Sequence, residues 1–169
     1  VVESLGADRV LCRPDEYLAR NVQKETGVQI IAWKGRCIVH EQFTVEMLRA
    51  YRRQYPGLVV LAHPECAPEV CAEADYVGST TGMVKHLDRV QARRVLLVTE
   101  CSMSDNVAAA HPEMEFVRTC TLCPHMKRIT LEKTLVSLRD GVHEVVVPEP
   151  VRVRARRALD RMLDVGRDD

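Results

Sequence analysis

The sequence predicts an α/β fold of the three-layer αβα type, in which a parallel sheet is covered by helices on both faces. The first observation is that apolar, strand-like runs alternate with helical segments along nearly all of the 169 residues. The second is that runs such as LVVLA at Leu58–Ala62 and RVLLVT at 94–99 are continuous in Val and Leu. Such continuous runs are typical of strands buried on both faces, whereas half-exposed strands alternate apolar with polar residues.

The first part of the chain predicts two strands with a helix between them. Arg9–Cys12 and 28–33 (VQIIAW) are short apolar runs. A helix is predicted over 14–26, because Pro14 suits a first helical position and Gly27 suits a C-terminal stop.

The middle of the chain continues the alternation. Thr44 suits the N-cap of a helix over Val45–Gln54, which the following Pro-Gly pair would end. Leu58–Ala62 is a continuous apolar strand. A short helix should follow it, with Pro68 near its first position.

The rest of the chain predicts shorter elements of the same kinds. Strands are expected at 75–78, 94–99, 115–117 and 143–147, and helices at 83–90, 105–110, 130–139 and 150–163. Thr130 suits an N-cap, and Pro150 suits a first helical position.

Composition excludes several classes of protein. Lys and Arg number 24 and Asp and Glu number 24, and this balance argues against nucleic acid or an anionic membrane as the main partner. Seven cysteines at irregular spacing favour a reducing cytosol over a secreted disulfide scaffold. Neither a membrane span nor a signal peptide is recognisable. The chain begins Val1-Val2-Glu3 without an initiator Met, so we expect that it is part of a longer protein whose N-terminal part is missing here.

Polar side chains follow four of the predicted strands. Ligands of parallel α/β sheets bind just beyond the carboxyl ends of strands, so these side chains are expected to converge on one site. They are Cys37 and His40, His63 and Glu65, Ser79 and Thr80, and Thr99 and Glu100.

The segment 119–127 (TCTLCPHMK) carries a Cys-x-x-Cys pair before a helix expected to start near Ile129. A helix start favours the thiolate, which is the form that binds metals and iron–sulfur clusters. Cys120 and Cys123 therefore indicate metal or cluster ligation, thiol–disulfide exchange, or two core cysteines, and the pair alone does not decide between them. The remaining cysteines are expected to be small apolar fillers: Cys12, Cys66, Cys71 and Cys101.

Each strand-end motif has a functional and a purely structural interpretation. Cys37 is either a thiolate ligand or a buried loop cysteine. His63 and Glu65, two residues apart, either bind a substrate carboxylate and move a proton or satisfy loop backbone. Ser79 and Thr80 either form an anion pocket at a helix start or act as a plain N-cap.

Together these motifs resemble the quinolinate synthase family. The matching segments occur in that family's order and at about its spacing, and they cover essentially the whole chain. They are 33–40 (WKGRCIVH), 63–65 (HPE), 77–80 (VGST), 98–100 (VTE) and 123–127 (CPHMK). The resemblance implies that the chain corresponds to roughly the C-terminal half of the enzyme.

The resemblance implies a fold of three αβα domains around a pseudo-threefold axis. Residues 1–36 would end the middle domain and residues 37–118 would form the last domain. Residues 119–169 would form a C-terminal segment that carries a cluster cysteine and packs back on a first domain outside this chain.

The resemblance also implies a cofactor and a reaction. Cys37 and Cys123 would be two of the three ligands of a [4Fe–4S] cluster, with the third cysteine outside this chain. The enzyme would condense iminoaspartate with dihydroxyacetone phosphate to quinolinate, releasing phosphate and water, in NAD biosynthesis. A functional link to L-aspartate oxidase is expected, and the chain in isolation is expected to be inactive.

The resemblance further implies residue roles. Glu65 would be the acid/base, and His63 would hold a substrate carboxylate or carbonyl oxygen. Ser79 and Thr80 would bind phosphate or carboxylate. The segment 99–102 (TECS) departs from the family pattern, so no role is assigned there.

Two alternatives come from other classes. One is a zinc- or redox-active thiol module built on Cys120 and Cys123, with His125 or His40 completing a zinc site. The other is an α/β interaction domain without catalysis, in which Cys37 and Cys123 would have no function.

Overall fold

The computed structural model describes residues 1–165, and its contacts divide the chain into two units. One unit is Ala7–Cys123, and the other combines Val1–Gly6 with the segment that begins at Pro124. The strands are β1 (Arg9–Cys12), β2 (Gln29–Ala32), β3 (Leu58–Ala62), β4 (Tyr76–Val77), β5 (Arg94–Val98) and β6 (Glu115–Val117). The α-helices are α1 (Glu16–Gln23), α2 (Val45–Gln54), α3 (Pro68–Ala72), α4 (Thr80–Leu87), α5 (Ser102–Ala110), α6 (Leu131–Asp140) and α7 (Glu149–Val165).

The larger unit is built around a four-stranded parallel sheet in the order β4-β3-β5-β6. In the central pair, Leu58 lies opposite Arg94 and Ala62 lies opposite Val98. Because all pairings are parallel, the carboxyl ends of the four strands lie at one edge of the sheet. The loops that follow β3, β4, β5 and β6 therefore begin at this edge.

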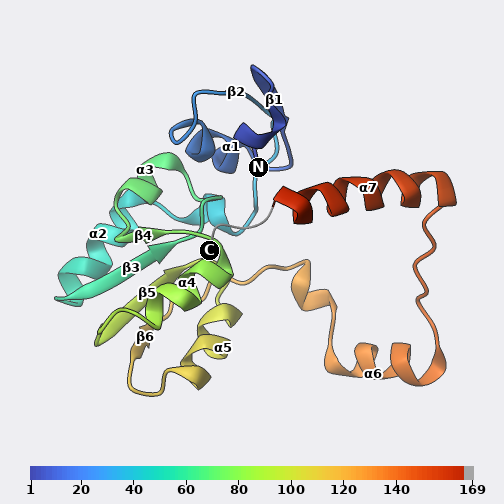
Figure 1. Ribbon diagram of the computed structural model, residues 1–169. Coiled ribbons are helices and arrows are strands. Elements are labelled where there is room, and N and C mark those ends of the chain that lie inside the picture. The colour runs from blue at the N-terminus through green and yellow to red at the C-terminus, as the bar shows by residue number, and fades with distance from the viewer. Residues whose placement is uncertain (166–169) are drawn as a thin grey trace. The chain divides into compact units, whose positions relative to one another are not determined.

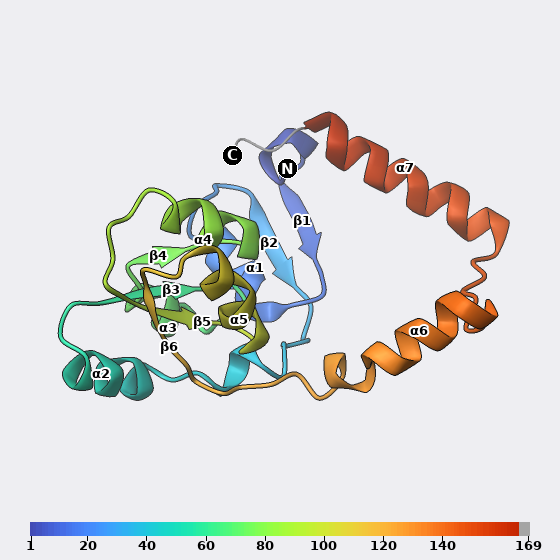
Figure 2. The same ribbon diagram turned by 90° about the horizontal axis from the view of Figure 1, so that it is seen from below.

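Helices cover both faces of this sheet, as predicted (Figures 1 and 2). On one face, Val60 and Val98 pack with α2 and α3 through residues such as Leu48 and Val70. On the other face, β3 and β5 residues pack with α4 and α5, where Met83, Leu87 and Val107 are buried. Continuous apolar strands thus supply both cores, because successive side chains point to opposite faces.

Strands β1 and β2 form a separate two-stranded parallel sheet, and α1 connects them. Asn21 of α1 is buried, and its Nδ2 donates to the carbonyl oxygens of Pro64 (2.8 Å) and Cys66 (3.0 Å) and lies 3.4 Å from Cys71 Sγ. One amide group thereby ties α1 to the loop after β3.

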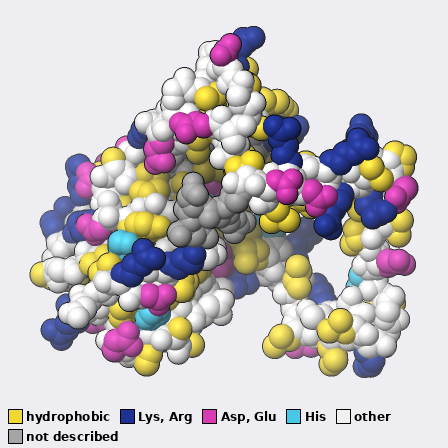
Figure 3. All heavy atoms as spheres, viewed as in Figure 1, with side chains coloured by type: hydrophobic (Ala, Val, Ile, Leu, Met, Phe, Trp, Pro, Cys, Tyr) yellow, Lys and Arg dark blue, Asp and Glu magenta, His cyan; other side chains and the backbone are white. Residues whose placement is uncertain are grey.

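The other unit contains two short 3-10 turns, η1 (Glu3–Leu5) and η3 (Met126–Arg128), and the helices α6 and α7. Leu131, Leu138 and Val145 of this unit are more than three-quarters exposed. Apolar and charged side chains are mixed along its surface in Figure 3. Within the described part of the chain, no helix is both long enough and apolar enough to cross a membrane.

The predicted strand at 143–147 is wrong. The structure has an irregular segment there, and Val145 and Val146 are 85% and 77% exposed. The apolar run suggested a buried strand, but an extended segment needs a neighbour to receive its backbone hydrogen bonds. The described residues offer it no such partner strand.

Several predicted helix boundaries are also wrong, because side-chain caps start these helices at residues other than those that apolar periodicity predicted. Helix α1 begins after Asp15, whose carboxylate accepts the N–H of Leu18, and it ends at Gln23 rather than near Thr26. Helix α4 begins at Thr80 instead of residue 83, since Ser79 is its N-cap. Side-chain caps fix helix starts more closely than apolar periodicity does.

Helix α6 begins at Leu131 with Thr130 as its N-cap, as the capping argument predicted. The 3-10 turn η3 and Ile129 lie between Cys123 and this helix in the chain. The helix start expected near Ile129 is therefore confirmed, at Leu131. The domain boundaries at residues 36 and 118, and the pseudo-threefold arrangement, stay predictions.

Replacing Asn21 with Ala should lower the free energy of unfolding by about 1–3 kcal/mol, because the carbonyl oxygens of Pro64 and Cys66 each lose a donor. Urea denaturation followed by circular dichroism measures this. The matched control is Asn106→Ala on the exposed surface of α5, which should change stability by less than about 0.5 kcal/mol. Equal effects of the two substitutions would contradict the role given to Asn21.

Candidate functional site

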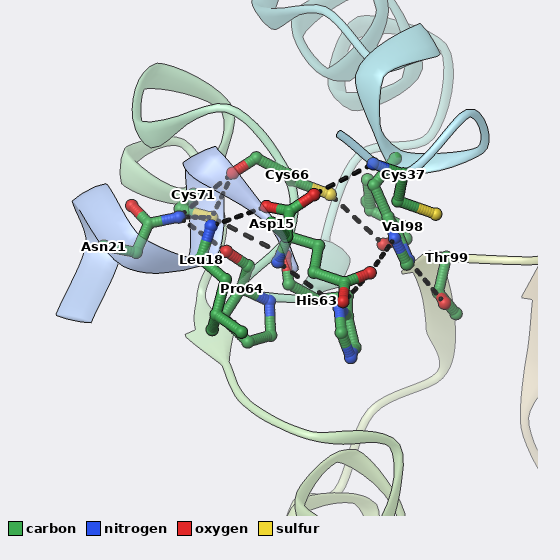
Figure 4. Close-up of polar contacts among 12 residues, drawn as sticks. Asp15, Leu18, Asn21, Cys37, His63, Pro64, Cys66, Cys71, Val98 and Thr99 are labelled. Atoms are coloured by element: carbon green, nitrogen blue, oxygen red, sulfur yellow. Dashed lines mark hydrogen bonds and ion pairs between the residues drawn. The ribbon is translucent and has the colours of Figure 1, made fainter. Parts of the chain in front are cut away.

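The carboxyl edge of the four-stranded sheet brings together side chains from separate segments of the chain. Figure 4 shows Asp15, Cys37, His63 and Thr99 close to one another. They come from the start of α1, the loop after β2, the loop after β3 and the end of β5. The convergence predicted from strand-end positions is therefore present for these loops.

The Cys37 loop is held by a buried carboxylate. Asp15 is 2% exposed, and its Oδ2 accepts the backbone N–H of Cys37 at 2.9 Å while its Oδ1 caps α1 through Leu18. Gly35 also matters here, because a Cβ at this position would collide with the carbonyl oxygen of Pro14. The backbone before Cys37 therefore runs directly against the segment that starts α1.

His40 lies at the centre of the site. It is 6% exposed; its Nδ1 lies 2.9 Å from Glu65 Oε2, and its Nε2 lies 3.0 Å from Thr99 Oγ1. Hydrogen bonding to His40 is the largest cause that lowers the pKa of the Glu65 carboxyl, and His63 and Cys37 add smaller contributions. Glu65 is therefore a carboxylate at neutral pH, held through one oxygen.

His63 lies against His40, with ring centroids 4.5 Å apart and an angle of 11° between the planes. The backbone N–H of Glu65 points at His63 Nδ1, at 3.3 Å. Because Nδ1 accepts this bond, a neutral His63 carries its proton on Nε2. Burial, followed by the neighbouring His40, lowers the pKa of His63, while Glu65 opposes the shift. His63 is thus a neutral hydrogen-bond donor at physiological pH.

Cys123 is positioned in the same way as Cys37. Glu100 is buried at the end of β5; its Oε1 accepts the backbone N–H of Cys123 at 3.3 Å, and its Oε2 accepts that of Ser102 at 2.7 Å. Cys123 and Cys37 both pack against the core cluster on the α2 and α3 face of the sheet. Both loops are thus anchored to one core.

Ser79 and Thr80 follow β4 at the same edge. The Ser79 Oγ accepts the N–H of Gly82 at 3.1 Å, so the predicted N-cap is present. Both residues are exposed. The backbone N–H groups of the first helical turn have no hydrogen-bond acceptor within the helix. The geometry is compatible with both interpretations, because a capping hydroxyl still has its own proton to donate.

The thiols of the site fit cluster ligation. Cys37 and Cys123 are free and half-buried, which keeps a thiol within reach of a metal group while limiting water. Cys37, His40 and Glu65 form the one group of three metal-binding side chains in residues 1–165 whose donor atoms all lie within 4.8 Å. This group contains neither Cys120 nor Cys123, so it does not support a zinc site on the Cys-x-x-Cys pair.

The other cysteines differ in burial. Cys66 and Cys71 are buried, as predicted for apolar fillers, and burial raises the pKa of both thiols, that of Cys71 to about 11. Cys12 and Cys101 are only half-buried, and Cys120 is exposed. Desolvation raises the pKa of Cys101, so this thiol is not activated.

Sequence reasoning missed Asp15 and Asn21, and it named His40 and Thr99 as strand-end residues without pairing them. Asp15, Asn21 and the pair His40–Thr99 are buried polar groups bonded across the fold. Asp15 could have been found as an N-cap before α1. The partners of His40 and Thr99 lie more than twenty residues away in the chain, so no local pattern could have paired them.

Comparisons with known proteins agree on one family. The model of the family described as quinolinate synthetase A protein matches residues 1–164. A quinolinate synthase of Agrobacterium fabrum is 56% identical over 165 residues, which is 98% of this chain and 48% of that relative. Quinolinate synthase 1 of Mesorhizobium japonicum is 58% identical over 98% of the chain and 51% of its own length, and that of Caulobacter vibrioides is 46% identical over 95% and 44%. The chain therefore spans about half the length of these curated relatives.

The stability of the chain should depend on the protonation of His63. Its pKa in the folded state is lowered, so as pH falls below the unfolded value of about 6.5 the unfolded chain binds the proton first. The contribution of His63 is therefore fully present above that pH and lost as pH falls through the folded pKa. His63→Asn should flatten the pH dependence of urea denaturation.

A histidine NMR titration gives the direct check. A midpoint for His63 at or above its ordinary value would contradict the burial argument.

Proposed function

The chain belongs to the quinolinate synthase family, and we propose that it forms part of an enzyme that condenses iminoaspartate with dihydroxyacetone phosphate. The products would be quinolinate, phosphate and water, in NAD biosynthesis. The observation that carries the proposal is the arrangement of Cys37, His63 and Glu65 at one sheet edge, with His40 joining two of their loops. Thiolates bind iron–sulfur clusters, and imidazole and carboxylate groups bind substrate oxygens and transfer protons.

The cluster proposed for the site is [4Fe–4S], with Cys37 and Cys123 as ligands and a third cysteine supplied from outside this chain. When bound through three cysteines, such a cluster supplies an open iron that acts as a Lewis acid toward substrate oxygen or nitrogen. Asp15 and Glu100 would hold the two cysteine loops through their backbone amides. Buried carboxylates would thus hold the backbone of both cysteines that this chain contributes to the cluster.

Glu65 would accept and return protons during isomerisation and dehydration. Its lowered pKa keeps it ionised at neutral pH, as a base must be before it accepts a proton. The bond from His40 holds one carboxylate oxygen. That bond fixes the direction in which the carboxylate faces a substrate.

His63 and the start of α4 would bind substrate. A neutral His63 offers its Nε2 proton to a carboxylate or carbonyl oxygen, since Nδ1 is already an acceptor. Ser79 and Thr80 offer hydroxyls and helix-start amides, which suit phosphate or carboxylate. Phosphate bound there would lie at the same sheet edge as the proposed base.

The remaining parts of the proposal concern the cellular setting. The enzyme would act in the cytoplasm on small molecules, without a nucleic-acid or membrane partner. Iminoaspartate is the product of oxidising aspartate, so a functional link to L-aspartate oxidase is proposed. The isolated chain is expected to be inactive.

The cluster is tested in a chimera in which this chain replaces the matching region of the Agrobacterium fabrum relative. After anaerobic reconstitution, the chimera should show a broad absorbance near about 400 nm, typical of thiolate-to-iron charge transfer. Cys37→Ala and Cys123→Ala should each abolish it, whereas Cys12→Ala in β1 should retain it. Stoichiometric zinc without iron in the parent chimera would favour the thiol-module alternative.

The acid/base role is tested by Glu65→Gln in the same chimera. Quinolinate formation should fall by about 100-fold or more, because general acid–base catalysis contributes on that order, while the cluster absorbance stays. Glu46→Gln in the first turn of α2 is the matched control and should keep full turnover. Full turnover in Glu65→Gln would remove the proposed role.

A further inference from the structure

His40 has no assigned role, yet its ring contacts side chains on two other site segments. It begins the 3-10 turn η2 (His40–Gln42) shortly after Cys37. One ring nitrogen faces Glu65 on the loop after β3, and the other faces Thr99 at the end of β5. A single buried ring therefore connects three segments of the site.

The hydrogen-bond partners define where the proton of His40 lies. An ionised carboxylate only accepts hydrogen bonds, so the 2.9 Å contact with Glu65 requires a proton on His40 Nδ1. In a neutral imidazole the other nitrogen is then an acceptor. The Thr99 hydroxyl, 3.0 Å from Nε2, can satisfy it by donating.

His63 depends on the same ring. The two imidazoles are stacked at 4.5 Å, and His63 accepts the Glu65 backbone N–H through Nδ1. The two histidines thus have opposite tautomers. His40 carries its proton on Nδ1 and donates it to Glu65, whereas His63 carries its proton on Nε2, where it can bind another partner. A change in the orientation of His40 would disturb both Glu65 and His63.

We propose that His40 is a positioning residue that holds the Glu65 carboxylate and supports the His63 ring, and that the Thr99 hydroxyl fixes the Nδ1–H tautomer of His40. The catalytic part of this inference rests on the proposed function, because it gives Glu65 and His63 a reaction to serve. The tautomer part does not. In the arrangement Thr99–His40–Glu65, the hydroxyl donates to the ring and the ring donates to the carboxylate.

Conservative substitutions of His40 distinguish a positioning role from a role in packing alone. An Asn amide can occupy the place of the imidazole Nδ1, whereas a Gln amide reaches the place of Nε2. In the chimera, His40→Ala should lower kcat by about 10- to 100-fold with a much smaller change in KM, a range typical of partners that orient functional side chains. His40→Asn should recover part of the loss, because it can still donate to Glu65, and His40→Gln should not.

Substitutions of Thr99 test whether its hydroxyl fixes the tautomer of His40. Thr99→Ser keeps the hydroxyl and should stay near the parent kcat, whereas Thr99→Val should lower kcat by about 10-fold, because a buried Nε2 loses its donor. His86→Asn is the matched histidine control and should not change kcat. Equal losses in the Asn, Gln and Ala variants at residue 40, or losses that track unfolding alone, would overturn the positioning role.

The tautomer is measured without any reaction. Nitrogen-15 NMR of histidine-labelled chain distinguishes protonated from unprotonated ring nitrogens, and His40→Asn assigns the His40 signals among the six histidines. A proton on Nδ1 of His40 and on Nε2 of His63 supports the inference. A proton on Nε2 of His40 overturns it. If the parent chimera forms no quinolinate, the proposed function fails, and the NMR result still decides the assignment of His40.

Discussion

The parallel pairing of β3 with β4 and β5, and of β5 with β6, is the constraint on which the site depends. Parallel strands in one sheet end at the same edge, and here the pairing in register of Leu58 with Arg94 and of Ala62 with Val98 aligns the two central strand ends. His63 and Thr99 directly follow those ends. Their closeness therefore follows from the register of the strands, and side chains on distant loops become neighbours without any local sequence signal.

Buried polar contacts then fix the loops that the sheet brings together. Asn21 holds the loop after β3 against α1, and His40 joins that loop to β5. Buried polar groups are costly unless every donor and acceptor is paired, so these contacts favour one loop arrangement over others. Because of this cost, we expect the positions of Glu65 and His63 to depend on residues that would touch no substrate.

The sequence predicted the sheet better than it predicted the site. Continuous Val and Leu runs identified β3 and β5, and Thr44 and Thr130 marked helix starts, because these signals lie within a few residues of the element they specify. The strand expected at 143–147 lacked a partner in the described chain, and no local signal reports a missing partner. The role of His40 was missed for the converse reason, since its partners are distant in sequence and adjacent only after folding.

The loops of the two proposed cluster cysteines are held in the same way, each by a buried carboxylate that accepts two backbone N–H groups. Asp15 accepts the N–H of Leu18 at the start of α1 and that of Cys37, while Glu100 accepts the N–H of Ser102 at the start of α5 and that of Cys123. A carboxylate suits this task because it has two oxygens and several lone pairs, whereas a neutral amide offers one acceptor oxygen. Each carboxylate thereby couples a helix start to a cysteine loop. Because the helices pack on the sheets, the backbone at each thiol is fixed by the folded core, and a ligand set completed from outside the chain would meet two thiols already in position.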